Sequence, residues 1–372
     1  MIPFLNDHLS TLMRTVHSVI NRSPKHLLRE VILVNDHSTS PALYGDLKEY
    51  LETNFNGLVH VIDLPVRSGL ITARIAGAHH ATGDVLVFLD SHVEANVNWL
   101  PPLLDPIAEN YRTCVCPFID VIDSSTYAYR AQDEGARGVF EWNFLYKRIP
   151  IRKGDRATKS DPFPSPIMAG GLFAISAKFF WELGGYDPGL DIWGGEQYEL
   201  SFKIWLCGGQ MYDAPCSRIG HIYRHSPFAN ARNGTDYVTR NFKRVAEVWM
   251  DEFKEFLYDR NPGKYSRVDV GDISKQLEVK KRLQCKPFKY FLEEVAPDMV
   301  DKYPYFENPV FASGVVSFQD IFIDSFTKMS YNFRLKVWVY QESALIQWEE
   351  RRLDFSVVLV AKSTLIKVKH LN

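Results

Sequence analysis

The chain has 372 residues, of which 46% are apolar and 13% aromatic, and its formal net charge is −2. This composition is sufficient for a packed core and excludes an intrinsically disordered chain. No basic excess points to a nucleic-acid partner. No apolar stretch approaches the length of about 20 residues that a membrane helix needs, so we expect no transmembrane segment in this chain.

The first half of the chain alternates short apolar runs with helical patterns. This order predicts an α/β fold with a doubly wound mixed, largely parallel sheet. The first run looks like the second half of a strand, so we expect the chain to start inside a domain. We expect Ser10 to cap the first helix. Strands are predicted at 2–4, 31–34, 59–62 and 85–89, and helices at 10–19, 43–55 and 70–81.

The alternation ends near residue 120. Residues 123–165 contain few long apolar runs, and we expect an insertion with loops there. Residues 168–173 predict a glycine-interrupted strand or a turn. Helices are predicted at 179–183, 199–206 and 238–260. From about residue 306 the chain continues in apolar runs without strand–helix order, so we expect a boundary there.

Asp90-Ser91-His92 directly follows the apolar run at 85–89. Ligands bind at this carboxyl edge in open α/β sheets. Positions i and i+2 of an extended segment point to the same side, so Asp90 and His92 could hold one divalent cation. His221 could supply a third ligand, and Arg224 could pair with a phosphate. The alternatives are a polar turn, a structural histidine and a surface ion pair.

Three further motifs suggest a binding site. Asp36 ends the second strand as Asp90 ends the fourth, and it could accept hydrogen bonds from a base or ribose or simply form a turn. Gly170-Gly171 could mark close approach of the backbone to a ligand or a bulge. Trp193-Gly194-Gly195-Glu196 could expose an indole on a flexible loop, with Glu196 opening a helix. Core packing of the tryptophan and capping by the glutamate are the alternatives.

These motifs, in this order, resemble the polypeptide N-acetylgalactosaminyltransferases, which start mucin-type O-glycosylation. The resemblance covers about residues 2–306. Its carriers are Arg14-Thr15-Val16, Ile32-Leu33-Val34-Asn35-Asp36, Arg67-Ser68-Gly69-Leu70, Phe88-Leu89-Asp90-Ser91-His92, Met168-Ala169-Gly170-Gly171-Leu172-Phe173, Trp193-Gly194-Gly195-Glu196, Gly220-His221 and Glu247-Val248-Trp249-Met250-Asp251-Glu252.

The resemblance implies a GT-A catalytic domain over residues 1–306, with UDP-GalNAc as donor and Ser or Thr of a polypeptide as acceptor. The implied reaction is a retaining transfer of N-acetylgalactosamine in the Golgi lumen. It further implies Mn2+ held by Asp90, His92 and His221. Asp36, Arg67 and Ser91 are implied to bind uridine and diphosphate, and Trp193, Arg224 and Phe228 to lie on the loops over UDP. Gly170, Gly171 and Glu196 are implied to line the sugar pocket. The implied catalytic residues are Glu196, Trp193 and Arg224.

The chain has five cysteines. Cys114 and Cys116 lie in a strand-like run and are expected to be buried thiols. Cys207, Cys216 and Cys285 are disulfide candidates in an oxidising compartment, and at least one cysteine must lack a partner. The family resemblance implies that Cys207 pairs with Cys285.

The chain also departs from the family pattern. Leu5 stands where the family has a histidine, Asp7 where it has a glutamate, and Thr72 where an arginine is usual. Residues 307–372 are expected to hold at most a remnant of one ricin-type lectin repeat. These departures favour an alternative function, a catalytically inactive relative that binds UDP with Mn2+ or a protein partner. A transferase that uses another sugar nucleotide on a lipid or glycan is a third possibility.

Overall fold

The computed structural model describes residues 1–132, 135–223 and 236–306, together with four short strands between residues 340 and 370. Met1–Phe306 is one compact unit and Glu307–Asn372 is a second. In the second unit, β13 (Tyr340–Gln341) pairs with β14 (Ala344–Leu345) and β15 (Phe355–Val357) with β16 (Val368–His370), both antiparallel. The expected lectin-repeat remnant therefore falls mostly outside the described residues.

The first unit contains all the elements that bear on function. Its strands are β1 (Ile2–Phe4), β2 (Val31–Asn35), β3 (Val59–Asp63), β4 (Val85–Phe88), β5 (Val93–Ala95), β6 (Thr113–Ile122), β7 (Tyr129–Arg130), β8 (Ala136–Glu141), β9 (Leu145–Pro150), β10 (Phe163–Pro164), β11 (Phe173–Ser176) and β12 (Gln210–Ile222). Its helices are α1 (Leu9–Arg22), η1 (Pro41–Leu43), α2 (Gly45–Phe55), α3 (Leu70–His80), α4 (Pro101–Glu109), α5 (Ala177–Glu182), α6 (Glu196–Leu206), α7 (Tyr237–Trp249), η2 (Asp251–Phe253), α8 (Lys254–Asp259), α9 (Pro262–Tyr265), α10 (Ser274–Arg282), α11 (Phe288–Tyr290), η3 (Phe291–Val295) and α12 (Met299–Lys302).

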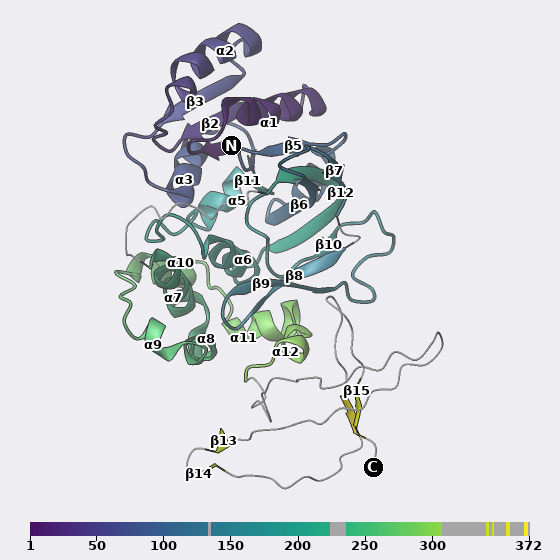
Figure 1. The fold of residues 1–372 in the computed structure, drawn as a ribbon, viewed down its shortest axis with the longest axis vertical. Helices are drawn as coiled ribbons and strands as arrows, with labels where there is room; N and C mark the ends of the chain where they lie inside the picture. Colours follow the sequence, from purple (N-terminus) through teal and green to yellow (C-terminus); the bar gives the residue numbers. More distant parts are fainter. Residues whose placement is uncertain are drawn as a thin grey trace, which may run out of the picture. The chain divides into compact units, whose positions relative to one another are not determined.

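The predicted strand–helix alternation is present, and the sheet is mixed. Strands β1, β2 and β3 pair in parallel in the order β1-β2-β3. Met1 connects β1 to β4, because its nitrogen donates to Val87 O and its carbonyl accepts from Leu89 N. Beyond β4 the order is β4-β11-β6-β12-β10, in which β11 runs antiparallel to β4 and β6 while β6 and β12 are parallel. Figure 1 shows β2 and β3 with α1 and α2 at one end of this unit.

The central strands are buried on both faces. Along β11, Phe173 and Ile175 belong to one hydrophobic cluster, whereas Ala174 between them belongs to another. The first cluster includes side chains of α5, α6, α7 and α8, and the second includes side chains of α1, α2 and α4. Successive residues of a strand point to opposite faces, so helices covering both faces make each strand almost wholly apolar.

Two helix predictions are corrected by the structure. The N-cap of α1 is His8, not Ser10, because the His8 ring accepts from the backbone nitrogen of Ser10. The helix predicted at 238–260 is broken after Trp249, where Asp251 adopts a φ of 48°. Residues Asp251–Phe253 then form the short helix η2, and α8 follows it. A left-handed residue cannot continue an α-helix, and apolar periodicity does not reveal it.

The expected insertion contains a β-hairpin in addition to loops. Strands β8 and β9 pair antiparallel, from Ala136 with Pro150 to Glu141 with Leu145. The hairpin buries large side chains between polar ones, with Phe140 and Trp142 completely inaccessible to solvent. Long apolar runs are missing because two of the four buried positions of β8 are Arg137 and Gly138, and β9 buries only Ile149. This explains why the sequence pattern did not reveal it.

The cysteines follow the expected pattern. Cys207 and Cys285 form a disulfide with an S–S distance of 2.04 Å. Cys114 and Cys116 are buried free thiols, and Cys216 is an exposed free thiol. Among the described helices, none combines the length and apolar character needed to cross a membrane.

Candidate functional site

The structure brings Asp90, His92 and His221 together at one end of the mixed sheet. Asp90 and His92 follow β4, and His221 lies near the end of β12. Antiparallel pairing of β5 with β12 places His221 opposite Val93, so the two histidines are neighbours. One ligand atom from each of the three residues lies within 4.8 Å of the others. The His221 Nε2 to Asp90 Oδ2 distance is 3.2 Å.

The three side chains are sheltered, with exposed fractions of 21% for Asp90, 14% for His92 and 13% for His221. Burial alone raises the pKa of Asp90, but the hydrogen bond with His221 and the charge of Arg74 outweigh it and lower this pKa below its usual value. Asp90 is therefore ionised at neutral pH. Two imidazoles and a carboxylate converging in this way suit a divalent transition-metal ion.

Asp7 contacts this cluster through Ser91 and His92. It follows β1, and its side chain is 6% exposed. Ser91 Oγ donates to Asp7 Oδ2 at 2.7 Å, and Asp7 Oδ1 lies 3.7 Å from His92 Nδ1. A carboxylate beside the second nitrogen of a ligating imidazole orients the ring and raises its basicity. In the sequence, Asp7 stands out only as a departure from the family pattern, although its place at the carboxyl end of a predicted strand is a signal for a site residue.

Arg74 is a second residue of the candidate site that the sequence pattern does not single out. It lies on α3, has no exposed side-chain surface, and donates to Gly170 O at 2.7 Å and Gly171 O at 2.8 Å. Its Nη2 is 3.4 Å from Asp90 Oδ1. Burial lowers the pKa of Arg74, but Tyr186, Asp90 and Glu196 outweigh this and raise it. The available signal was a charged residue on the buried, alanine-rich face of the predicted helix.

Asp36 organises the loop before α3. Its carboxylate accepts from the backbone nitrogens of Ser68 at 2.6 Å and Gly69 at 2.8 Å, and it is 4% exposed. Burial raises the pKa of Asp36, and these two hydrogen bonds oppose the rise. Arg67, predicted to contact the diphosphate, is exposed on the same loop. Gly69 forms an isolated bridge with Ile192, next to Trp193.

Trp193 lies just after Ile192, which contacts Gly69, and Glu196 begins α6 three residues later. Trp193 is 37% exposed, and Glu196, the first residue of α6, is 3% exposed. Burial raises the pKa of Glu196, and the positive charge of Arg74 opposes the rise. Its Oε2 has no hydrogen-bond partner among the residues that the structure describes. A buried carboxylate oxygen with unused acceptor capacity suits a ligand hydroxyl.

Comparisons with known proteins agree with this geometry. Residues 1–184 match the family described as Glycosyl transferase family 2, and residues 157–226 match the N-terminal domain of galactosyltransferase. The chain is 59% identical over 339 residues to N-acetylgalactosaminyltransferase 6 of Drosophila melanogaster, covering 89% of this chain and 50% of the relative. It is 52% identical over 318 residues to polypeptide N-acetylgalactosaminyltransferase 10 of Homo sapiens, covering 85% and 52%.

A solved structure decides the family. The chain matches a crystal structure of GalNAc-T7 with UDP, GalNAc and Mn2+ at a TM-score of 0.78 and 40% identity, covering 100% of this chain and 71% of that one. The chain belongs to the polypeptide N-acetylgalactosaminyltransferase family. Its fold is therefore of the GT-A type, as the sequence predicted. The chain spans about half the length of the curated members of the family that it matches.

Within this N-acetylgalactosaminyltransferase fold, most of the predicted site residues can be placed. Asp90, His92 and His221 converge, Ser91 is buried beside them, and Gly170 and Gly171 lie against Arg74. A Cβ added at Gly171 would lie 2.8 Å from Asp90 Oδ2, so only glycine fits there without movement. The predicted residues Arg224 and Phe228 lie outside the described residues.

Proposed function

We propose that this protein transfers N-acetylgalactosamine from UDP-GalNAc to Ser or Thr hydroxyls of polypeptides, with retention of configuration. The convergence of Asp90, His92 and His221 on one point is the observation that carries this proposal. Family membership supports it, and so does the GalNAc-T7 structure, which holds UDP, GalNAc and Mn2+. We further propose that Met1–Phe306 is the catalytic domain, and that residues 307–372 hold at most a remnant of one lectin repeat.

The cluster fits Mn2+, because it offers one ionised carboxylate and two imidazoles within 4.8 Å of one another. We assign Asp90, His92 and His221 as the residues that hold the ion. When bound, Mn2+ neutralises the charge that develops on the departing diphosphate. Asp7 and Arg74 keep His92 and Asp90 in orientation.

The chain's own residues supply donor binding and the exclusion of water. Asp36 fixes the backbone of the loop that carries Arg67. We assign Arg67 to bind the nucleotide. Glu196 offers a sugar hydroxyl its Oε2, which has no hydrogen-bond partner among the described residues, and an analogue lacking that hydroxyl would leave this buried oxygen unpaired. Trp193 is 37% exposed and follows Ile192, which bridges to Gly69; we assign Trp193 to shield the sugar from water, which would otherwise hydrolyse the donor.

We place this reaction in the Golgi lumen. The support comes from the family and from the Cys207–Cys285 disulfide, since disulfides persist in oxidising compartments and are rare in the cytosol.

Mass spectrometry tests the proposal directly. The purified chain is incubated with UDP-GalNAc, Mn2+ and a Thr-rich peptide, and the peptide is expected to gain the mass of one N-acetylhexosamine. His221→Ala is expected to abolish this gain because one of the three ligands is lost. Asp46→Asn is the matched control, since it removes an exposed acidic side chain on α2. A wild-type chain that binds donor but never modifies any peptide would show that the proposed transfer is wrong.

A second candidate function is binding of UDP without transfer. Leu5 and Thr72 favour it, because they replace a histidine and an arginine of the family pattern, and Thr72 is exposed at the start of α3. Calorimetry separates the two functions. Tight, Mn2+-dependent binding of UDP without any turnover supports the inactive relative, and turnover excludes it.

A further inference from the structure

The segment that carries Trp193 contains a strained turn. Ile192 directly precedes the tryptophan and has a φ of 53°, a conformation that β-branched residues rarely adopt. The nitrogen of Trp193 donates to Asp191 O at 2.6 Å, which closes the turn around Ile192. Such conformations are strained and persist only where the surroundings impose them. The neighbours of this turn therefore decide where Trp193 lies.

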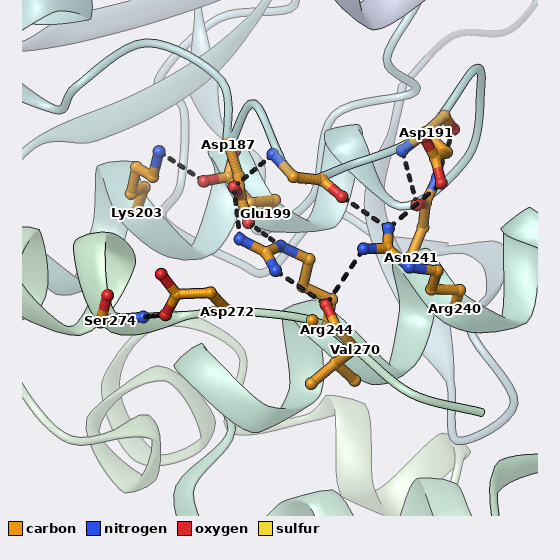
Figure 2. Close-up of polar contacts among 12 residues, drawn as sticks. Asp187, Asp191, Glu199, Lys203, Arg240, Asn241, Arg244, Val270, Asp272 and Ser274 are labelled. Carbon is orange, nitrogen blue, oxygen red and sulfur yellow. Dashed lines mark hydrogen bonds and ion pairs between the residues drawn. The ribbon is translucent and has the colours of Figure 1, made fainter. Parts of the chain in front are cut away.

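Asn241 on α7 imposes the turn from one side. Its side chain is fully buried, and its Oδ1 accepts from the nitrogen of Asp191 at 2.8 Å. Its Nδ2 donates to Asp191 O at 2.7 Å and to Gly194 O at 2.8 Å, with Trp193 O at 3.3 Å. Figure 2 shows the Asn241 amide pointing into this segment. One side chain thus binds the backbone on both sides of Ile192.

Two arginines of the same helix extend this contact. Arg240 donates to Gly189 O at 2.6 Å and lies 3.3 Å from Asp191 Oδ2. Arg244 forms a buried, two-pronged ion pair with Asp187 (Figure 2). Helix α7 therefore holds the chain from Asp187 to Gly194 through three side chains, those of Arg240, Asn241 and Arg244. Of these, Asn241 contacts the part nearest Trp193.

The loop before α3 closes the turn from the other side. A Cβ added at Gly69 would lie 2.4 Å from Ile192 Cα, so the two backbones are in direct contact. The nitrogen of Gly69 donates to Asp36 Oδ2, and Asp36 thereby fixes the loop that carries Arg67, the residue assigned above to the nucleotide. The Ile192 turn is thus held between α7 and the loop of the nucleotide pocket.

We propose that Asn241 is a positioning residue that holds the Ile192 turn and thereby keeps Trp193 over the donor sugar. This inference rests on the proposed function, because it concerns the donor that Trp193 would shield. Trp193 directly follows this turn and is 37% exposed, and Asn241 holds the backbone from which its side chain projects. Loss of the Asn241 amide is expected to release the turn, admit water to the sugar and favour hydrolysis of the donor over transfer.

Two variants of Asn241 are compared with a control on the same helix. Asn241→Asp keeps the acceptor for Asp191 N but turns the donor into an oxygen that faces the carbonyls of Asp191 and Gly194. Asn241→Ala removes the whole side-chain amide and all of its hydrogen bonds to the segment. Lys243→Met is the control, because Lys243 Nζ donates to Tyr265 O and Val268 O, both at 2.8 Å, and these lie outside the segment.

The first measurement is the ratio of UDP-GalNAc hydrolysis to peptide transfer. We expect Asn241→Asp and Asn241→Ala to raise this ratio by about five-fold or more, because positioning groups control the reacting geometry. Lys243→Met is expected to leave the ratio unchanged even if it lowers the melting temperature. In a Trp193→Ala background, Asn241→Asp should add less than about two-fold, because residues acting through one another are non-additive.

Hydrogen exchange of the intact chain provides a readout that does not require activity. Asn241→Ala should speed exchange of the Asp191 amide, whereas Lys243→Met should not. Unchanged exchange, or faster exchange with an unchanged hydrolysis ratio, would overturn the role of Asn241. A wild-type chain with neither transfer nor hydrolysis would instead overturn the proposed function. An active wild type with unaffected Asn241 variants refutes the positioning role alone.

Discussion

The Arg74 guanidinium lies 3.4 Å from the Asp90 carboxylate and is completely shielded from solvent. The same guanidinium binds the carbonyls of Gly170 and Gly171. Arg74 therefore fixes one proposed metal ligand and the backbone of the proposed sugar pocket at the same time. Because α3 begins directly after Gly69, one helix also connects this wall to the loop held by Asp36.

Removal of the Arg74 charge should be strongly destabilising. Arg74→Met leaves the carbonyls of Gly170 and Gly171 without a donor and Asp90 without its counter-charge, so we expect the free energy of unfolding to fall by about 3–5 kcal/mol. Arg14→Met is the control, because Arg14 pairs with Glu94 at the surface and is expected to cost less than about 1 kcal/mol. Urea denaturation measures both. Equal losses in the two variants would contradict the assigned role.

Asp7 should control the affinity for the metal without binding it. Asp7→Asn preserves the shape of the side chain but removes the negative charge beside His92, so we expect Mn2+ affinity to fall by about 10-fold to 100-fold. His221→Ala should abolish Mn2+ binding altogether. Electron paramagnetic resonance of free Mn2+ measures both effects in the absence of UDP-GalNAc. An Asp7→Asn variant that binds Mn2+ like the wild type would show that Asp7 has no supporting role.

The sequence predicts the parts of the candidate site that depend on local pattern. Asp90 and His92 were found because a buried strand ends there and positions i and i+2 share a side. His221 is 131 residues from Asp90; the sequence alone offers it as a possible third ligand, and the family resemblance implies that it is one. Asp7, Arg74 and Asn241 were missed, because each acts through a contact between distant segments, such as the 96 residues between Arg74 and Gly170.

In the fold, too, local features follow from the sequence pattern whereas long-range pairings do not. The alternation of β1 to β4 with α1 to α3 follows from apolar periodicity, which is a local property. The antiparallel insertion of β11 between β4 and β6 is a long-range pairing that no periodicity encodes. The break at Asp251 depends on a single left-handed residue inside an otherwise amphipathic pattern.

The Cys207–Cys285 disulfide should contribute substantially to stability. It joins cysteines 78 residues apart in the sequence, and closing a loop of that length in the unfolded chain is worth roughly 4 kcal/mol. We expect the double variant Cys207→Ser with Cys285→Ser to melt well below the wild type, and a reductant to lower the wild-type melting temperature similarly. Cys216→Ser, at an exposed free thiol, should change nothing. A double variant as stable as the wild type would contradict this contribution.

Glu199 should make stability depend on pH around neutrality. It is buried on α6 and pairs with Lys203, and the two side chains appear together in Figure 2. Burial raises the pKa of Glu199 from 4.5 to about 7, although the charge of Lys203 opposes the rise. Between pH 4.5 and about pH 7, Glu199 is therefore protonated in the folded chain and ionised in the unfolded chain. Stability from this group is therefore complete below pH 4.5 and declines as the pH rises through 7.

The variant Glu199→Gln removes this titration. The difference in unfolding free energy between the wild type and Glu199→Gln should fall by up to about 3 kcal/mol from pH 4.5 to pH 8, in favour of the variant. Glu255→Gln, at an exposed position on α8, should give a profile parallel to the wild type. Urea denaturation across the pH range measures all three proteins. If the wild type and Glu199→Gln also run parallel, Glu199 is already ionised at low pH, and the Lys203 charge outweighs the effect of burial.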